Sequence, residues 1–148
     1  MAIALTWLVR YGHVLSAAVW VGTYALLSFL IVPLLMRERG GELGKLAVAS
    51  VRVGSYAGTL TMAFGFVLIA RMREGYGSLV GTTWGAFVLA SVAAAVALLG
   101  LNDACLRPAL RRLIRGGNGG RAHGWAIACL ALAILALGLM TGATYAGR

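Results

Sequence analysis

Four long stretches of this chain contain no charged residue and no histidine. They cover residues 14–36, 53–70, 75–102 and 124–147, with lengths of 23, 18, 28 and 24 residues. A helix needs about 20 mainly apolar residues to cross the hydrocarbon core of a membrane. Because lipid offers no hydrogen-bond partner to the backbone, a segment that crosses it alone is helical. The pattern therefore predicts an all-α integral membrane protein with four transmembrane helices.

The expected architecture is an antiparallel four-helix bundle that forms a single domain, 1–148. Short loops make consecutive helices run up, down, up and down. The helices are predicted near residues 7–36, 46–70, 80–104 and 124–146. An apolar fraction of 61% and a charged fraction of 11% exclude a disordered chain and a disulfide scaffold.

Arginine and lysine are divided unequally between the two ends of this bundle. One end carries nine, namely Arg37, Arg39, Lys45, Arg52, Arg107, Arg111, Arg112, Arg115 and Arg121, and the other carries Arg10, Arg71, Arg73 and Arg148. Loops rich in Lys and Arg stay in the cytoplasm. We therefore expect a multi-pass plasma-membrane protein with cytoplasmic loops 37–45 and 105–123 and with both termini on the outer side. The lipid bilayer, and not nucleic acid, is the partner that this distribution indicates.

Two further patterns concern packing. Residues 106–115 alternate apolar and arginine side chains, which predicts a basic extension of the third helix; a helix lying on an anionic membrane surface is the alternative. The glycine pairs Gly54 with Gly58 and Gly138 with Gly142 predict close helix contacts, either within one molecule or in a homodimer.

Few side chains in the chain can carry chemistry. There are two His, two Cys and four acids, without a metal-ligand cluster of known spacing or a catalytic triad. Cys105 and Cys129 are expected to be buried and reduced, and Asp103 is expected to pair with Arg107. We expect His123 to cap a helix or lie at the interface, and the protein not to be an enzyme by itself.

His13 belongs to the most polar and aromatic stripe of the first helix. At 100° per residue the stripe falls within about 20° of one line and contains Thr6, His13, Trp20, Tyr24 and Ile31. Such a stripe is expected to face the interior of the bundle. Arg10 lies one turn outward of His13, and Ala17 lies one turn inward and leaves space beside the imidazole.

These residues suit a haem, because a neutral imidazole is a common axial ligand in helical bundles. A small residue admits the flat ring, and arginines at the rim suit its propionates. His13, Ala17 and Arg10 meet these needs, and Arg71 and Arg73 could reach the same rim. A hydrogen-bonded histidine in the interfacial belt is the alternative interpretation.

A second ligand must lie at the same depth as His13. Met140 has that depth, whereas Met62 lies nearer the middle of the bilayer. His123 is excluded because its depth differs from that of His13 by roughly 25–30 Å at 1.5 Å per residue.

The segment RYGHVLSAAVWVG at residues 10–22 places a histidine seven residues before Trp-x-Gly. It resembles the start of the copper-resistance-D-like membrane proteins, which are similar to the four-helix protoporphyrinogen oxidases that bind haem b. Arg52 ahead of a glycine-rich stretch and the Leu-Arg-Pro at 106–108 are further similarities. The resemblance implies haem b bound at His13, with Trp20 as a packing neighbour. Oxidase activity is not carried over, because residues 82–85 lack the Lys or His that those relatives place there.

Two classes of function follow. The first is a haem b-binding membrane protein, of cytochrome b type, for electron transfer or haem handling near the outer face. The second is a non-catalytic subunit or scaffold of a larger, respiratory-type membrane complex. A copper-transport role is the third, although the chain has no Met-x-x-Met and no multiple-histidine array.

Overall fold

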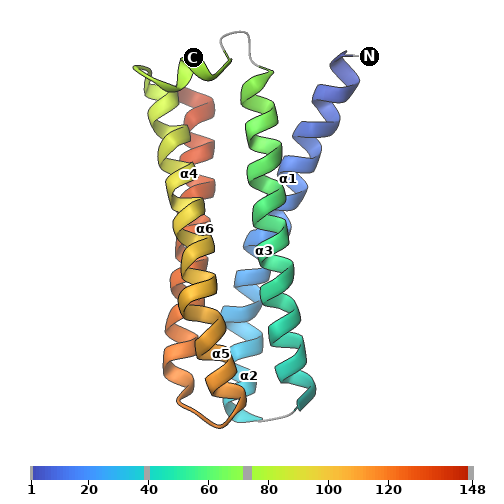
Figure 1. The fold of residues 1–148 in the computed structure, drawn as a ribbon, viewed down its shortest axis with the longest axis vertical. Helices are drawn as coiled ribbons and strands as arrows, with labels where there is room; N and C mark the ends of the chain where they lie inside the picture. The colour runs from blue at the N-terminus through green and yellow to red at the C-terminus, as the bar shows by residue number, and fades with distance from the viewer. Residues whose placement is uncertain (1, 39–40, 72–74, 147–148) are drawn as a thin grey trace.

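The computed structural model describes residues 2–38, 41–71 and 75–146. All regular elements within these ranges are helices, and four of the helical segments are long and apolar enough to cross a membrane: Ile3–Arg37, Gly41–Ala70, Thr83–Ile114 and Gly119–Ala146. The prediction of an all-α chain with four membrane-length helices is confirmed. Figure 1 shows the segments running alternately down and up, so that the first begins and the last ends at the same end of the bundle.

Two of the four segments contain a π-helical turn. The first consists of α1 (Ala2–Leu26), η1 (Leu27–Ile31) and α2 (Val32–Arg37), and the third consists of α4 (Thr83–Leu101), η3 (Asn102–Leu106) and α5 (Arg107–Ile114). The second and fourth are α3 (Gly41–Ala70) and α6 (Gly119–Ala146), and the short 3-10 helix η2 (Gly75–Leu79) precedes α4.

Each π turn lies just before one of the two prolines, Pro33 and Pro108. A proline inside a helix has no N–H to donate, and its ring clashes with the carbonyl four residues earlier. One extra residue in the preceding turn widens the helix and separates the ring from that carbonyl. The third helix therefore continues through its proline to Ile114 and does not end near residue 104 as predicted.

Three predicted helix starts also differ from the structure, whereas the predicted ends near residues 36, 70 and 146 agree with the observed ends at residues 37, 70 and 146. Helices begin at residues 2, 41 and 119, whereas the sequence places these starts near 7, 46 and 124. In the second and fourth helices the added first turns each contain one cation, Lys45 or Arg121, whose long side chain can reach water from a membrane surface. The predicted basic extension of the third helix over residues 106–115 is confirmed. Its Leu106, Leu110 and Leu113 are buried in the bundle, so this apolar face packs inward and not onto a membrane surface.

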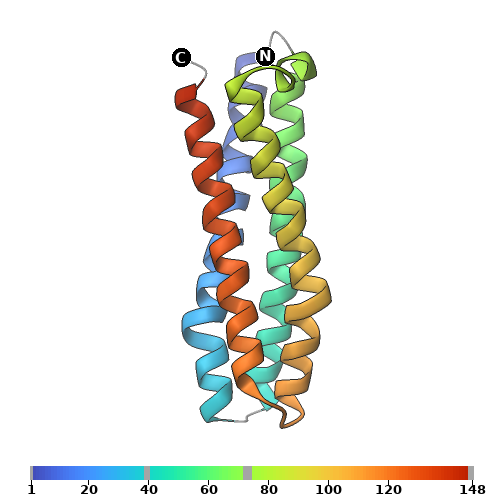
Figure 2. The same cartoon turned by 90° about the vertical axis from the view of Figure 1, so that its left-hand side faces the viewer.

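The helices pack as two close pairs, α1 with α3 and α4 with α6, as Figures 1 and 2 show from two sides. The main core joins the pairs in the half of the bundle that contains α2 and α5, where Tyr24, Leu27, Leu98 and Leu110 are fully buried. Toward the chain ends, α1 leans away from the α4 and α6 pair (Figure 1). The two pairs therefore fit together less tightly in that half.

Three of the four glycines in the two predicted pairs form close helix contacts inside this molecule. A Cβ on Gly58 would lie 2.6 Å from Trp20 Cε2, and a Cβ on Gly54 would lie 3.3 Å from Thr23 Cγ2. These two glycines let α1 approach α3 closely. In the second pair, a Cβ on Gly142 would lie 3.1 Å from Phe87 Cε1 on α4, whereas nothing lies within 4 Å of the Cβ position of Gly138.

Candidate functional site

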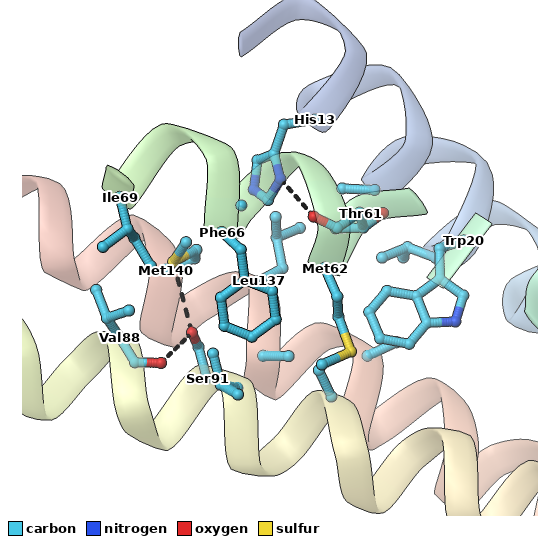
Figure 3. A pocket seen from close by; sticks show the side chains of 17 residues that line it. His13, Trp20, Thr61, Met62, Phe66, Ile69, Val88, Ser91, Leu137 and Met140 are labelled. Carbon is cyan, nitrogen blue, oxygen red and sulfur yellow. Dashed lines mark hydrogen bonds between the residues drawn. The ribbon is translucent and has the colours of Figure 1, made fainter. Parts of the chain in front are cut away.

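A cavity lies between the two helix pairs, and all four long helices line it. The centre of a water-sized molecule can move through about 80 Å³ of it, and its empty space is about 650 Å³ when the part open to the surroundings is included. A water molecule needs only about 10–15 Å³ on the first measure. Figure 3 shows His13 and Trp20 reaching the cavity from α1, Thr61, Met62 and Phe66 from α3, Ser91 from α4 and Met140 from α6.

The His13 ring is held in one orientation by α3. Its Nδ1 lies 2.8 Å from the backbone oxygen of Thr61. A carbonyl oxygen only accepts, so Nδ1 carries the hydrogen and Nε2 of the neutral ring keeps a free lone pair. Histidines that bind metals are commonly oriented by such a bond from the other ring nitrogen.

A second set of hydrogen bonds fixes the same region of α1 against α3. The buried Thr61 hydroxyl donates to Ser16 Oγ at 3.0 Å, and Ser16 Oγ lies 3.0 Å from the backbone oxygen of His13. The Ser16 and Thr61 hydroxyls thus link the backbone beside His13 to the helix that orients its ring.

Gly65 provides the space in which the imidazole lies. A Cβ at this position would be 3.2 Å from His13 Cε1 and 3.6 Å from Nδ1, closer than the about 3.5–4.0 Å at which carbon atoms attract best. Any larger residue would therefore push the ring away from α3. The sequence placed Gly65 in a glycine-rich stretch without identifying its neighbour.

Met140 lines the cavity from α6, at the depth that the sequence predicted. Its Sδ lies 3.5 Å from Ser91 Oγ, and the Ser91 hydroxyl also lies 2.7 Å from the backbone oxygen of Val88, to which it donates. A thioether is a weak acceptor and a soft metal ligand. Met62 lines the cavity as well, so one imidazole and two thioethers share it.

Not all the residues predicted for the site line this cavity. His13, Ala17, Trp20 and Met140 do. Three others lie elsewhere: Arg10 is exposed, Tyr24 is fully buried in the main core, and the exposed Arg71 lies with its Nη1 3.5 Å from Thr6 Oγ1, to which it donates. Arg73 falls outside the described residues.

Tyr24 shares the wheel position of His13 but lies about three turns further along α1, at 3.6 residues per turn. At that depth the two helix pairs are in contact, and Gly54 packs beside the Tyr24 ring. The interior-facing stripe of α1 therefore lines the cavity at His13, where the two helix pairs lie further apart, and is packed in the core at Tyr24, where the pairs are in contact.

His123 and the cysteines lie away from the cavity. His123 Nε2 donates to the backbone oxygen of Ser28 at 3.1 Å, near the start of α6. Cys129 is buried and Cys105 is half-buried, and neither forms a disulfide. Among the described residues no group of three or more His, Cys, Asp or Glu could hold a metal ion.

A polar cluster joins α3 to η3 in the other half of the bundle. Asn102 Nδ2 donates to Ser55 Oγ at 3.0 Å and to Asp103 Oδ1 at 3.1 Å. Arg107 pairs with Asp103 at 3.3 Å and donates to Ser55 Oγ at the same distance. The predicted Asp103–Arg107 pair is therefore confirmed. Hydrogen bonds to Ser55 and Asn102 connect this pair to α3.

The donor chemistry of the cavity fits a haem iron, because a fixed imidazole with a free Nε2 and a thioether face the same space. The volume of the cavity is less favourable for a haem. Ligand sites for larger molecules occupy about 300–1,000 Å³, a range that the cavity reaches only with its open part. Phe66, which is 42% exposed, lies between His13 and Ser91 in Figure 3.

Comparisons with protein-family models, with curated proteins and with solved structures gave no match to this chain.

Proposed function

We propose that this chain is a small integral membrane protein that binds haem b, with His13 as an axial ligand and Met140 as the second. The observation that carries the proposal is the presence of both side chains in one cavity, together with the 2.8 Å bond that leaves His13 Nε2 free. The motif at residues 10–22, similar to the haem-binding four-helix membrane proteins, supports the same ligand.

Within this proposal each residue has a defined task. The Thr61 carbonyl and Gly65 orient the imidazole, and Ala17 leaves room beside it. The haem would supply one-electron chemistry, for electron transfer or for delivery to a partner subunit. Because the enclosed space is smaller than a macrocycle, loading requires Phe66 to turn outward or the two helix pairs to separate.

We propose an orientation in the plasma membrane with both termini outside and loops 37–45 and 105–123 in the cytoplasm. The excess of Lys and Arg at the end of the bundle formed by these loops supports it. In this orientation the His13 cavity lies in the outer half of the bilayer. A reporter active only in the cytoplasm should be inactive when fused after residue 148 and active when inserted at residue 118; the reverse result would contradict the orientation.

The deciding experiment is an absorbance spectrum of detergent-purified protein after expression with added haem, both oxidised and dithionite-reduced. We expect a Soret band that is lost in His13→Ala and retained in His123→Ala. His123 is a matched control because it bonds a backbone carbonyl as His13 does, but far from the cavity. Met140→Leu should convert a low-spin spectrum with a split α-band into a high-spin one.

Circular dichroism and elution volume establish that each variant is folded. A folded wild-type protein without a Soret band would refute the haem proposal. Co-purification of a stable partner from the native membrane, in the absence of a chromophore, would instead support the non-catalytic subunit.

Copper is a second candidate, because one imidazole and two thioethers line the same cavity. The centre of a water-sized molecule can move through about 80 Å³ of it. Soft thioethers favour Cu(I), and an ion needs no displacement of Phe66. Titration of Cu(I) against a coloured chelator should then show one site per chain that weakens in His13→Ala and in Met140→Leu. Equal affinity in the wild type and both variants would exclude copper binding at this cavity.

A further inference from the structure

A second hollow lies on the outer surface of α3, in the half of that helix away from the His13 cavity. The hollow is shallow, with about 630 Å³ of space that lies open to the surroundings, and its walls come from residues 41–56 of α3 and from Ile114 at the end of α5. Gly44 brings the two walls together, because its Cβ position lies only 3.2 Å from Ile114 Cγ1. The His13 site plays no part in this groove.

Along α3, the groove begins with positively charged residues and continues with apolar residues. At 100° per residue, Lys45, Arg52 and Tyr56 fall within about 40° on one face of α3. Arg52 lies about 10 Å beyond Lys45 along the helix axis, at 1.5 Å per residue. Val53 then begins the stretch without charge that runs to residue 70. The groove therefore changes from cationic to apolar in the direction of the membrane interior.

Lys45 and Arg52 differ in whether an acidic side chain already neutralises their charge. Lys45 Nζ pairs with Glu42 Oε1 at 2.7 Å, although both side chains are largely exposed. Arg52 is exposed and has no ion pair or side-chain hydrogen bond within the described ranges. A guanidinium binds phosphate oxygens through two parallel N–H bonds. Arg52 is thus the cation of the groove whose charge is not already matched by an acid within the described ranges.

We propose that this groove binds one anionic phospholipid, with its phosphate at Arg52 and Lys45 and an acyl chain along Val53 and Tyr56. The negative charge of such a lipid is complementary to the positive charge of the groove. The lipid also changes from an anionic headgroup to an apolar chain toward the membrane interior, as the groove changes from cationic to apolar. Basic pockets at helix surfaces on the cytoplasmic side are known lipid headgroup sites. An exposed tyrosine suits the level of the headgroups.

Native mass spectrometry of the protein in mild detergent, titrated with phosphatidylglycerol, tests the proposal. We expect tighter binding of phosphatidylglycerol than of phosphatidylcholine. Arg52→Gln should weaken the binding of phosphatidylglycerol by about fivefold, the effect of one cation near the headgroups. Arg121→Gln is the matched control, since Arg121 is exposed on α6 outside the groove, and it should change the affinity by less than about twofold.

A second variant separates the groove from general surface attraction. Ala49 lines the groove and is exposed, so Ala49→Trp fills the hollow and leaves every charge in place. We expect it to weaken phosphatidylglycerol binding as well. Equal effects of Arg52→Gln and Arg121→Gln, or unchanged binding in Ala49→Trp, would overturn the proposal. Equal affinity for phosphatidylcholine, or displacement of the lipid by millimolar inorganic phosphate, would overturn it too.

Discussion

Substituting Gly58 with alanine tests the close contact between α1 and α3 most directly. The added Cβ would lie 2.6 Å from Trp20 Cε2 and 2.8 Å from Nε1, whereas carbon atoms pack best at about 3.5–4.0 Å. The indole is 4% exposed and rigid, so the helices must separate by about 1 Å to accept the methyl group. Overpacking of this kind costs about 1–3 kcal/mol, against a gain of at most about 1 kcal/mol from replacing glycine in a helix.

We therefore expect Gly58→Ala to lower the free energy of unfolding by up to about 2 kcal/mol. Gly22→Ala is the matched control, because nothing lies within 4 Å of its Cβ position, and it should be neutral or slightly stabilising. Both can be measured by unfolding the protein in mixed micelles of a mild detergent and dodecyl sulfate, followed by circular dichroism. In a Trp20→Ala background the cost of Gly58→Ala should disappear. Equal stabilities of the Gly58 and Gly22 variants would refute the packing argument.

Three smaller predictions concern other contacts. Thr82→Ala should cost about 1 kcal/mol, and Thr82→Ser much less, in the same unfolding assay, because the hydroxyl accepts from the backbone N–H three residues on at 2.9 Å. A maleimide reagent should label the half-buried Cys105 in the folded protein and reach the buried Cys129 only after unfolding, as peptide mass spectrometry would show; equal labelling would contradict the burial. A Cβ at residue 65 would lie 3.2 Å from His13 Cε1, so Gly65→Ala should be about 1 kcal/mol less favourable in the wild type than in a His13→Ala background.

The number and type of helices followed from the sequence because a membrane imposes a simple rule on it. A stretch without charge that is long enough to span the bilayer has few alternatives to a helix. Helix starts at the membrane surface obey no such rule, because water can satisfy the backbone groups of a turn there whether or not it is helical. The main span of the third helix was predicted to end near residue 104, but a π turn over Asn102–Leu106 lets the helix continue through Pro108.

Those features of the candidate site that depend on position along or around a single helix could be predicted from the sequence. The wheel identified the interior stripe around His13, and depth along the helices selected Met140 over His123. The Thr61 carbonyl, Gly65 and Ser91 depend on how α3 and α4 are rotated toward α1 and α6. Hydropathy carries no information about that rotation, because lipid-facing and interior positions of these helices are almost equally apolar.

The two halves of the bundle differ in a way that decides where a cofactor could bind. In the half that contains η3, α5 and the start of α6, Asn102 and Arg107 both donate to Ser55, and large apolar side chains fill the remaining space. In the other half small residues such as Ala17 and Ala136 line the gap between the helix pairs, and the one histidine there is anchored through Nδ1 alone. A ligand can enter such a half without breaking the contacts of the tighter one. The proposed binding role fits the half with open space, because a ligand there meets fewer close contacts between the two helix pairs.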